Sequence, residues 1–437
     1  MNCPEGAREA GLGRWGTSPK GGGKYRLENT NMRAYKRLLR YAAIDTQSNG
    51  DNAAVTPSTE KQHAFSWLLH CELQDLGMKR VYTDPHAYTY AFLPASPGWE
   101  SEPVIGLIAH IDTAPDFSGT GVKPQTHFDY DGGDIALGTS GRVLSPRDFP
   151  ELKNCVGKTL ITTDGTTLLG ADDKAGVAEI MTVCETLIHS DRPHCALAVC
   201  FTPDEEIGHG ARLIDFKRFG AAFAYTVDGD AVEEINYETF NAAAASFRIK
   251  GVSVHPGSAK DVMVNASLVA MRINAMLPAD EIPARTEGYE GFYHLTEMRG
   301  DVSEAELKYI VRDHDAKRFL ARCDRLREIE GALNAEYGEG TVTLTCNEQY
   351  RNMAEILADH MQIVRRAEKA IRKAGLKPRT SPVRGGTDGA RLSFSGLPCP
   401  NLGTGGAAFH GPSEHIAVED MDKVVEILLN IVCEREE

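Results

Sequence analysis

The sequence contains no apolar run long enough to cross a membrane. A spanning helix needs about 20 apolar residues, and the run at 104–109 is typical of the longest ones here. Residues 1–31 also lack the apolar core of a signal peptide. The ten cysteines form no C-x-x-C pair, which favours reduced thiols over a disulfide framework. We therefore predict a cytoplasmic protein with no membrane partner.

Clusters of basic residues are also missing. The chain has 47 Lys and Arg against 62 Asp and Glu, which gives a formal net charge of −15. Proteins that bind nucleic acids do so largely through grouped Lys and Arg side chains, so we predict no nucleic-acid partner. With 437 residues, 42% of them hydrophobic, the chain is long and apolar enough for two or three folded domains.

Several common catalytic patterns are absent as well. The sequence has no G-x-S-x-G elbow, no H-E-x-x-H helix and no G-x-x-x-x-G-K-[ST] loop. A G-x-G-x-x-G match at 11–16 has no predicted strand before it and no predicted helix after it, so a dinucleotide site is not indicated. Residues 1–31 lack apolar periodicity and contain three adjacent glycines. They are predicted to be a disordered N-terminal extension.

From residue 32 to 240, predicted helices alternate with short apolar runs. The runs at 104–109, 197–201 and 221–227 are apolar on both faces, which is typical of buried parallel strands. Apolar stripes at helical spacing follow residues 59 and 176. The same style returns at 353–437. These two segments therefore predict one α/β domain with a mixed sheet flanked by helices.

Residues 241–352 have a different pattern. Apolar and polar residues alternate near 247–250, 307–312 and 342–346, which indicates strands with one buried face. A further strand is predicted near 294–298. Two helices are predicted between these strands, with apolar stripes formed by Val264, Leu268, Met271 and Ala275 and by Phe319, Cys323, Leu326 and Leu333. The order β-α-β-β-α-β predicts a ferredoxin-like α+β domain inserted into the first domain.

Side chains that can bind metals follow several of the predicted strands and turns. The carboxyl ends of strands in an open α/β sheet meet at one edge, so these side chains are expected to converge. The set supplies two imidazoles and three carboxylates, and it consists of His110, Asp172, Glu206, Asp228 and His410. Zn²⁺ accepts such nitrogen and oxygen ligands. Five ligands can serve two ions if one carboxylate bridges them.

Each of these residues also has a simpler interpretation. Asp172 or Asp173 could cap the helix that begins near Lys174, the pair Glu205 and Glu206 could be a solvated turn, and His110 could be a core histidine. Four coincidences at equivalent strand ends favour the metal site instead. Asp112 is spaced to hold the second ring nitrogen of His110. Glu205 is suited to accept a proton from water and pass it to a leaving amine.

Longer motifs resemble the M20 family of dizinc metallopeptidases. The resemblance spans about residues 40 to 430 and is carried by HIDTAPD at 110–116, ITTDGTTLLGADDKAG at 161–176, FTPDEEIGHG at 201–210, YTVDG at 225–229, VHPG at 254–257, GYEGFY at 288–293, RGGTDG at 384–389 and HGPSE at 410–414. It implies a zinc-peptidase-like catalytic domain in which Asp172 bridges two Zn²⁺ ions. His110 and Asp228 would complete one site, and Glu206 and His410 the other. Co²⁺ or Mn²⁺ could substitute, since the same ligands accept them.

The resemblance also implies roles for the remaining motif residues. Glu205 would be the general base and Asp112 the partner of His110. The domain at 241–352 would be a lid and dimerisation domain, so a homodimer is expected. His255 of that domain would stabilise the tetrahedral oxyanion, in its own or a partner subunit. Arg312 and Arg384 are candidates for the carboxylate of the peptide, although Arg312 suits a surface salt bridge about equally well.

The implied activity is that of a dizinc aminopeptidase. It would remove the N-terminal residue from short peptides with a free amine, above all from tripeptides. An alternative within the family is an amidohydrolase or dipeptidase acting on other small amides. A catalytically silent homologue would have lost a ligand or the base, and all of these residues are present.

Overall fold

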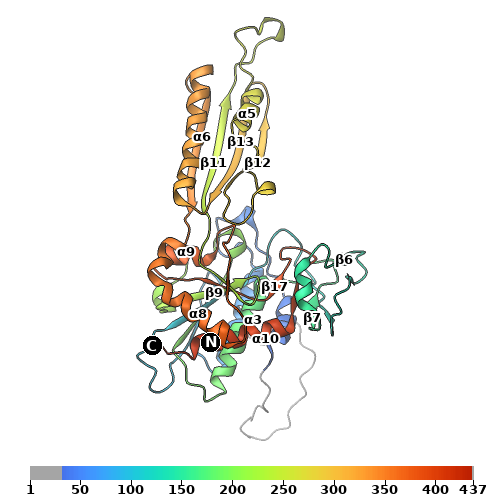
Figure 1. Cartoon of the computed structure of the whole chain (residues 1–437), viewed down its shortest axis with the longest axis vertical. Helices are drawn as coiled ribbons and strands as arrows, with labels where there is room; N and C mark the ends of the chain where they lie inside the picture. The colour runs from blue at the N-terminus through green and yellow to red at the C-terminus, as the bar shows by residue number, and fades with distance from the viewer. Residues whose placement is uncertain (1–31, 436–437) are drawn as a thin grey trace. The chain divides into compact units, whose positions relative to one another are not determined.

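The computed structural model describes residues 32–435, which form two compact units (Figure 1). The extension predicted at 1–31, with its glycine motif, lies outside the described residues. Among the described residues, the first unit comprises 32–236, 356–380 and 392–435, and the second comprises 237–355 and 381–391. The sequence-based division at 32–240, 241–352 and 353–437 differs most from these units at 381–391. This segment was assigned to the first domain but belongs to the second unit. Between residues 32 and 435, no helix is long and apolar enough to cross a membrane.

An eight-stranded mixed sheet forms the centre of the first unit. In spatial order its strands are β1 (Lys79–Thr83), β2 (Thr89–Leu93), β8 (Leu197–Thr202), β3 (Ile105–His110), β9 (Phe223–Gly229), β16 (Asn401–Gly403), β10 (Glu234–Asn236) and β15 (Arg379–Thr380). The neighbours β8, β3 and β9 are parallel, and every residue of β3 and β8 is buried. Burial on both faces explains their continuous apolar runs. Because these three strands are parallel, they end at the same edge of the sheet.

The helices of the first unit include α1 (Ala34–Ala42), α2 (Lys61–Leu76), α3 (Ala171–Ile188), α4 (Phe216–Phe219), α8 (Met361–Lys373) and α10 (Val418–Val432). Of these, α2, α3, α4 and α8 contact strands of the eight-stranded sheet, whereas α1 and α10 pack against α3. The most buried of them is α3, which packs against α1, α10 and strands β3 and β9 (Figure 1). Gly176 allows this close approach, because a Cβ there would lie 2.0 Å from the carbonyl oxygen of Val227. The beginning of α3 is therefore held beside the end of β9.

Smaller elements complete the first unit. A second sheet has the order β17 (Gly406–Ala407), β18 (His415–Ala417), β7 (Leu160–Thr162) and β4 (Gln125–His127), and β5 (Ile135–Ala136) pairs with β6 (Val143–Leu144). Two boundaries between the units fall within short helices. One lies between residues 355 and 356 in α7 (Ala354–Leu357), and the other lies between 391 and 392 in α9 (Asp388–Phe394). The loop between β17 and β18 carries His410.

The second unit is an antiparallel sheet with two helices on one face. Its elements follow the chain as β11 (Asn241–Lys250), α5 (Ala266–Ala275), β12 (Phe292–Gly300), β13 (Glu304–Asp313), α6 (Ala316–Tyr337) and β14 (Val342–Tyr350). The strand order is β12-β13-β11-β14, and the core lies between this sheet and the two helices. The predicted β-α-β-β-α-β order and the α/β fold class are confirmed.

The face that α5 buries differs from the predicted one. The helix forms where it was expected, but Leu268 and Met271 are 62% and 59% exposed. Its buried face consists of Ala266, Val269, Ala270 and Ile273. Two alanines on this face let the helix backbone approach the sheet closely, which the larger side chains would prevent. The prediction that the Leu268 stripe packs in the core was wrong.

Candidate metal centre

Asp172 presents its two carboxylate oxygens to two different histidines. Its Oδ1 lies 2.9 Å from Nε2 of His110, the last residue of β3, and its Oδ2 lies 3.2 Å from Nε2 of His410. The two histidines come from the β3 end and from the loop between β17 and β18. One carboxylate is therefore placed between two imidazoles that are 300 residues apart in the chain, since 410 − 110 = 300. This is the arrangement expected of a carboxylate that bridges two cations.

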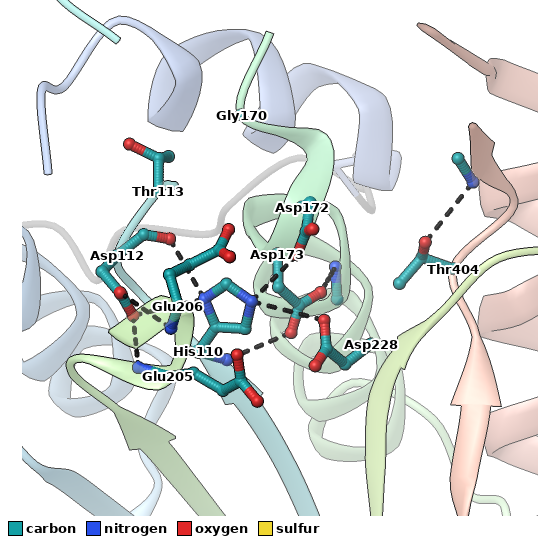
Figure 2. Close-up of polar contacts among 12 residues, drawn as sticks. His110, Asp112, Thr113, Gly170, Asp172, Asp173, Glu205, Glu206, Asp228 and Thr404 are labelled. Carbon is teal, nitrogen blue, oxygen red and sulfur yellow. Dashed lines mark hydrogen bonds and ion pairs between the residues drawn. The ribbon is translucent and has the colours of Figure 1, made fainter. Parts of the chain in front are cut away.

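The other two carboxylates extend this cluster on either side. Asp228, near the end of β9, places Oδ1 3.3 Å from Nε2 of His110, and Figure 2 shows the ring of His110 among Asp112, Asp172 and Asp228. Glu206 places Oε2 3.0 Å from Nε2 of His410. All five predicted ligands thus lie together at one edge of the first unit. Two groups of residues place their potential ligand atoms within 4.8 Å of one another inside each group. One group is His110, Asp172 and Glu206, and the other is His110, Glu205 and Asp228.

Burial and neighbouring charges shift the pKa values of the residues in this cluster. Burial and then the charge of Asp172 raise the pKa of Glu206 to about 8, and burial raises the pKa of Asp228 to about 6. Hydrogen bonds with Asp172 and Glu206 raise the pKa of His410 to about 11. Burial opposes charge on His110, but Asp228 and hydrogen bonds with Asp112 and Asp172 raise its pKa well above 6.5. The carboxylates thus raise the pKa of the imidazoles beside them, while burial disfavours the charged forms of Glu206 and Asp228.

These residues fit a divalent cation. Oε1 of Glu206 is buried and has no hydrogen-bond partner among residues 32–435, and its side chain is only 5% exposed. A buried carboxylate oxygen without a donor is costly unless a cation or water satisfies it. Two imidazole nitrogens and three carboxylates around this point are the ligand types that Zn²⁺, Co²⁺ and Mn²⁺ accept. The donor set and the unsatisfied oxygen both support a cation site.

Asp112 joins His110 to the two neighbouring glutamates. Its carboxylate accepts the main-chain N–H of Glu205 at 3.0 Å and that of Glu206 at 3.2 Å (Figure 2). Nδ1 of His110 lies 3.1 Å from the carbonyl oxygen of Asp112 and 3.3 Å from its Oδ1. Asp112 is fully buried. The predicted contact with the second ring nitrogen is present, and the bonds to the turn η4 (Glu205–Ile207) add a second function to the same side chain.

Three further buried carboxylates support the centre, and the sequence analysis did not predict this role for them. Asp173 accepts the main-chain N–H of His110 at 3.1 Å. Asp204 holds the turn before Glu205 by bonds to Ser58 and Gln62. Glu414 accepts three main-chain N–H groups from the segment 169–172. These acids belong to the motifs DD at 172–173, DEE at 204–206 and HGPSE at 410–414. Their roles become clear only from the residues that they contact in the folded protein.

The three residues predicted to bind substrate all lie in the second unit. His255 is exposed, and its Nδ1 accepts the N–H of Gly257. Arg312 donates to the carbonyl oxygens of Ala243 and Val311 and to Gln349, so its partners here include no carboxylate. Arg384 donates to the carbonyl oxygens of Gly288 and Glu290 and to Thr286. This last set of bonds anchors 381–391 in the second unit.

The fold and the site define an α/β protein with a candidate metal centre at the carboxyl ends of parallel strands. Residues 164–434 match the family described as Peptidase family M20/M25/M40, and the chain belongs to this family. It is similar to Peptidase T of Bacillus licheniformis, with 51% identity over 399 residues that cover 91% of this chain and 97% of that protein.

Solved structures show the same fold. An aminopeptidase, PepT, of Bacillus cereus matches with a TM-score of 0.73 at 24% identity, covering 92% of this chain and 98% of that one. A tripeptidase from Staphylococcus aureus also matches with a TM-score of 0.73, at 22% identity and with the same coverage. Both likenesses extend over the two units, so the inserted domain is part of the shared fold.

Proposed function

We propose that this protein is a dizinc aminopeptidase that removes the N-terminal residue from short peptides, above all tripeptides. The observation that carries the proposal is the position of Asp172, whose two oxygens face His110 and His410 at 2.9 and 3.2 Å. His110, Asp172 and Asp228 would hold one ion, and Asp172, Glu206 and His410 the other. The similarity to Peptidase T supports a peptide as the substrate.

The reaction needs a base beside the ions. Zinc ions, when bound, supply Lewis-acid polarisation of the scissile carbonyl and lower the pKa of water. Glu205 lies within reach of this position, because one of its carboxylate oxygens is within 4.8 Å of ligand atoms of His110 and Asp228. Its carboxylate would take a proton from the attacking water and return it to the leaving amine. Asp112 fixes the main chain of Glu205 and keeps His110 in a single orientation.

A panel of defined peptides tests the proposal. The purified protein is freed of metal, reloaded with Zn²⁺, Co²⁺ or Mn²⁺, and incubated with di-, tri- and tetrapeptides and with N-acetylated copies of each. We expect release of the N-terminal residue, fastest from tripeptides, and no cleavage of the acetylated copies. Cleavage of the acetylated peptides would instead support the amidohydrolase alternative. Failure to cleave any unblocked tripeptide with any of the three ions would contradict the proposal.

The second unit and the cellular location complete the proposal. We propose that the domain predicted at 241–352 acts as a lid and forms a homodimer, and that His255, Arg312 and Arg384 contact the peptide. Sedimentation measurements test the dimer, and His255→Ala should lower kcat with metal content unchanged. We also propose a cytoplasmic location, which the buried free thiol of Cys184 supports. Cys71 is disulfide-bonded and is an exception to the predicted reduced thiols.

A further inference from the structure

Glu414 lies four residues after His410, in the HGPSE motif, and is 1% exposed. Its Oε2 accepts the main-chain N–H groups of Leu169 and Gly170 at 2.7 and 2.9 Å. Its Oε1 accepts the main-chain N–H of Asp172 at 3.0 Å, across 242 residues of sequence. Both oxygens are therefore fully used by a single short segment of main chain.

This segment is the one that delivers Asp172 to the metal centre. The backbone of Asp172 has φ −81° and ψ 107°, so it is not helical. Its N–H consequently lies outside the hydrogen-bond pattern of α3 and needs another acceptor. Glu414 supplies that acceptor, and it belongs to the loop that carries His410. One carboxylate thus connects the segment of the bridging ligand to the segment of a second ligand.

We propose that Glu414 is a positioning residue of the metal centre, which sets the main chain of Asp172 so that its two oxygens face His110 and His410. This inference rests on the proposed function only for its kinetic readout, because metal binding tests it directly. Glu414 itself touches none of the five predicted ligands' side chains in the contacts described above. Its effect is transmitted through the N–H of Asp172 and through its own loop.

The three donors explain why this position needs a carboxylate. A carboxylate offers two oxygens and no donor, whereas an amide offers one oxygen and an NH₂ group. In Glu414→Gln, the single amide oxygen can accept either from Leu169 and Gly170 or from Asp172. The remaining main-chain N–H would then face the amide NH₂ group. If the amide oxygen stays with Leu169 and Gly170, the N–H of Asp172 is left without a partner. Glu414→Asp keeps both oxygens but shortens the side chain by one methylene.

The test is a titration of the metal-free protein with Co²⁺. The visible absorption spectrum of the bound Co²⁺ monitors the titration, and equilibrium dialysis measures the affinity. Glu414→Gln is expected to weaken Co²⁺ binding by about 10-fold to 100-fold and to change the spectrum at full occupancy. Glu414→Asp is expected to recover part of the affinity. In the peptide assay, kcat should fall while KM changes by less than about threefold, because Glu414 is buried and both of its oxygens accept main-chain N–H groups.

The matched control is Glu419→Gln. Glu419 also accepts a distant main-chain N–H, from Thr159 at 2.8 Å, but it lies outside the metal centre. This variant should bind Co²⁺ with wild-type affinity and spectrum. Wild-type Co²⁺ affinity and spectrum in Glu414→Gln would overturn the inference. If Glu414→Gln does not fold, as judged by circular dichroism, Glu414→Asp decides: a wild-type spectrum and affinity there would overturn it.

The two proposals can fail separately. If the wild-type protein binds two Co²⁺ ions and cleaves no peptide, the proposed function is wrong, while the Co²⁺ results still decide the role of Glu414. If the wild-type protein cleaves tripeptides and Glu414→Gln binds Co²⁺ normally, only the role of Glu414 is wrong.

Discussion

The carboxylate of Asp112 accepts the main-chain N–H of Glu205 at 3.0 Å, although the two residues are 93 positions apart. Asp112 also lies next to Nδ1 of His110. A proposed metal ligand and the proposed base are therefore positioned by the same buried side chain. Any change at Asp112 is expected to affect both of them together.

Replacing Asp112 with asparagine should lower kcat by about 10-fold to 100-fold. Asparagine keeps one acceptor oxygen, so the N–H of either Glu205 or Glu206 would face an amide NH₂. The measurement is kcat and KM on a tripeptide at saturating metal. Asp131→Asn is the matched control, since exposed Asp131 also accepts a main-chain N–H, from Gly133 at 2.8 Å. Equal activities of the two variants would show that the Asp112 bonds are not needed.

Replacing Glu205 with glutamine distinguishes a base from a ligand. A general base contributes about 10² to 10⁴ in rate, so Glu205→Gln should reduce kcat by at least about 10² with two metal ions still bound per chain. The grouping of Glu205 with His110 and Asp228 also allows Glu205 to be a ligand. In that case, the metal content measured by atomic emission would fall in the variant. Normal turnover would remove Glu205 from the mechanism altogether.

The convergence of the candidate ligands could be predicted from the sequence, for a physical reason. Buried parallel strands such as β3 are apolar throughout, so a His or Asp at the end of one is conspicuous. Parallel strands also end at one edge, which brings these ends together. His110 and Asp228 are examples, and the distances of 2.9 to 3.3 Å in the cluster agree with their predicted convergence.

Features that depend on tertiary contacts could not be predicted. The partners of Glu414 lie 242 to 245 residues away, and no local pattern marks them. Arg384 was assigned to the first domain by position, but its bonds to Gly288 and Glu290 place its segment in the second unit. On α5, hydrophobicity favoured Leu268, whereas the small size of Ala266 and Ala270 decided which face packs.

Metal affinity should rise with pH. In the metal-free centre, the pKa of His410 is raised to about 11 and that of Glu206 to about 8, so both hold protons at pH 7. Binding of a cation must displace these protons, and higher pH therefore favours binding. We expect Co²⁺ affinity to increase by at least about tenfold from pH 6.5 to 7.5.

Calorimetry provides the direct measurement of this linkage. Titrations at pH 7 in buffers of different ionisation enthalpy give the number of protons released per ion. A value above one proton per chain agrees with the predicted protonation of the metal-free centre. Binding that releases no protons, with an affinity independent of pH, would show that His410 and Glu206 are already deprotonated.

Glu179 should make the first unit less stable as pH rises. It lies within α3, is fully buried, and neither carboxylate oxygen has a hydrogen-bond partner among the described residues. Burial, and then the charge of Asp420, raises its pKa well above 4.5. Above the pKa of about 4.3 in the unfolded chain, the folded state holds one proton more than the unfolded state. The free energy of unfolding then falls by about 1.4 kcal/mol per pH unit from this group, until the pH passes the folded pKa.

Glu179→Gln removes this dependence, because the amide does not titrate. Unfolding of the metal-free protein by urea at pH 5.5, 6.5 and 7.5 measures the effect. Tryptophan fluorescence reports the first unit, because Trp67 and Trp99 lie there and the second unit contains no tryptophan. The third tryptophan, Trp15, lies outside the described residues. The stability of the variant relative to wild type should increase at each higher pH, since contributions from other titrating groups cancel in the comparison. A difference that stays constant with pH would mean that Glu179 has an ordinary pKa despite its burial.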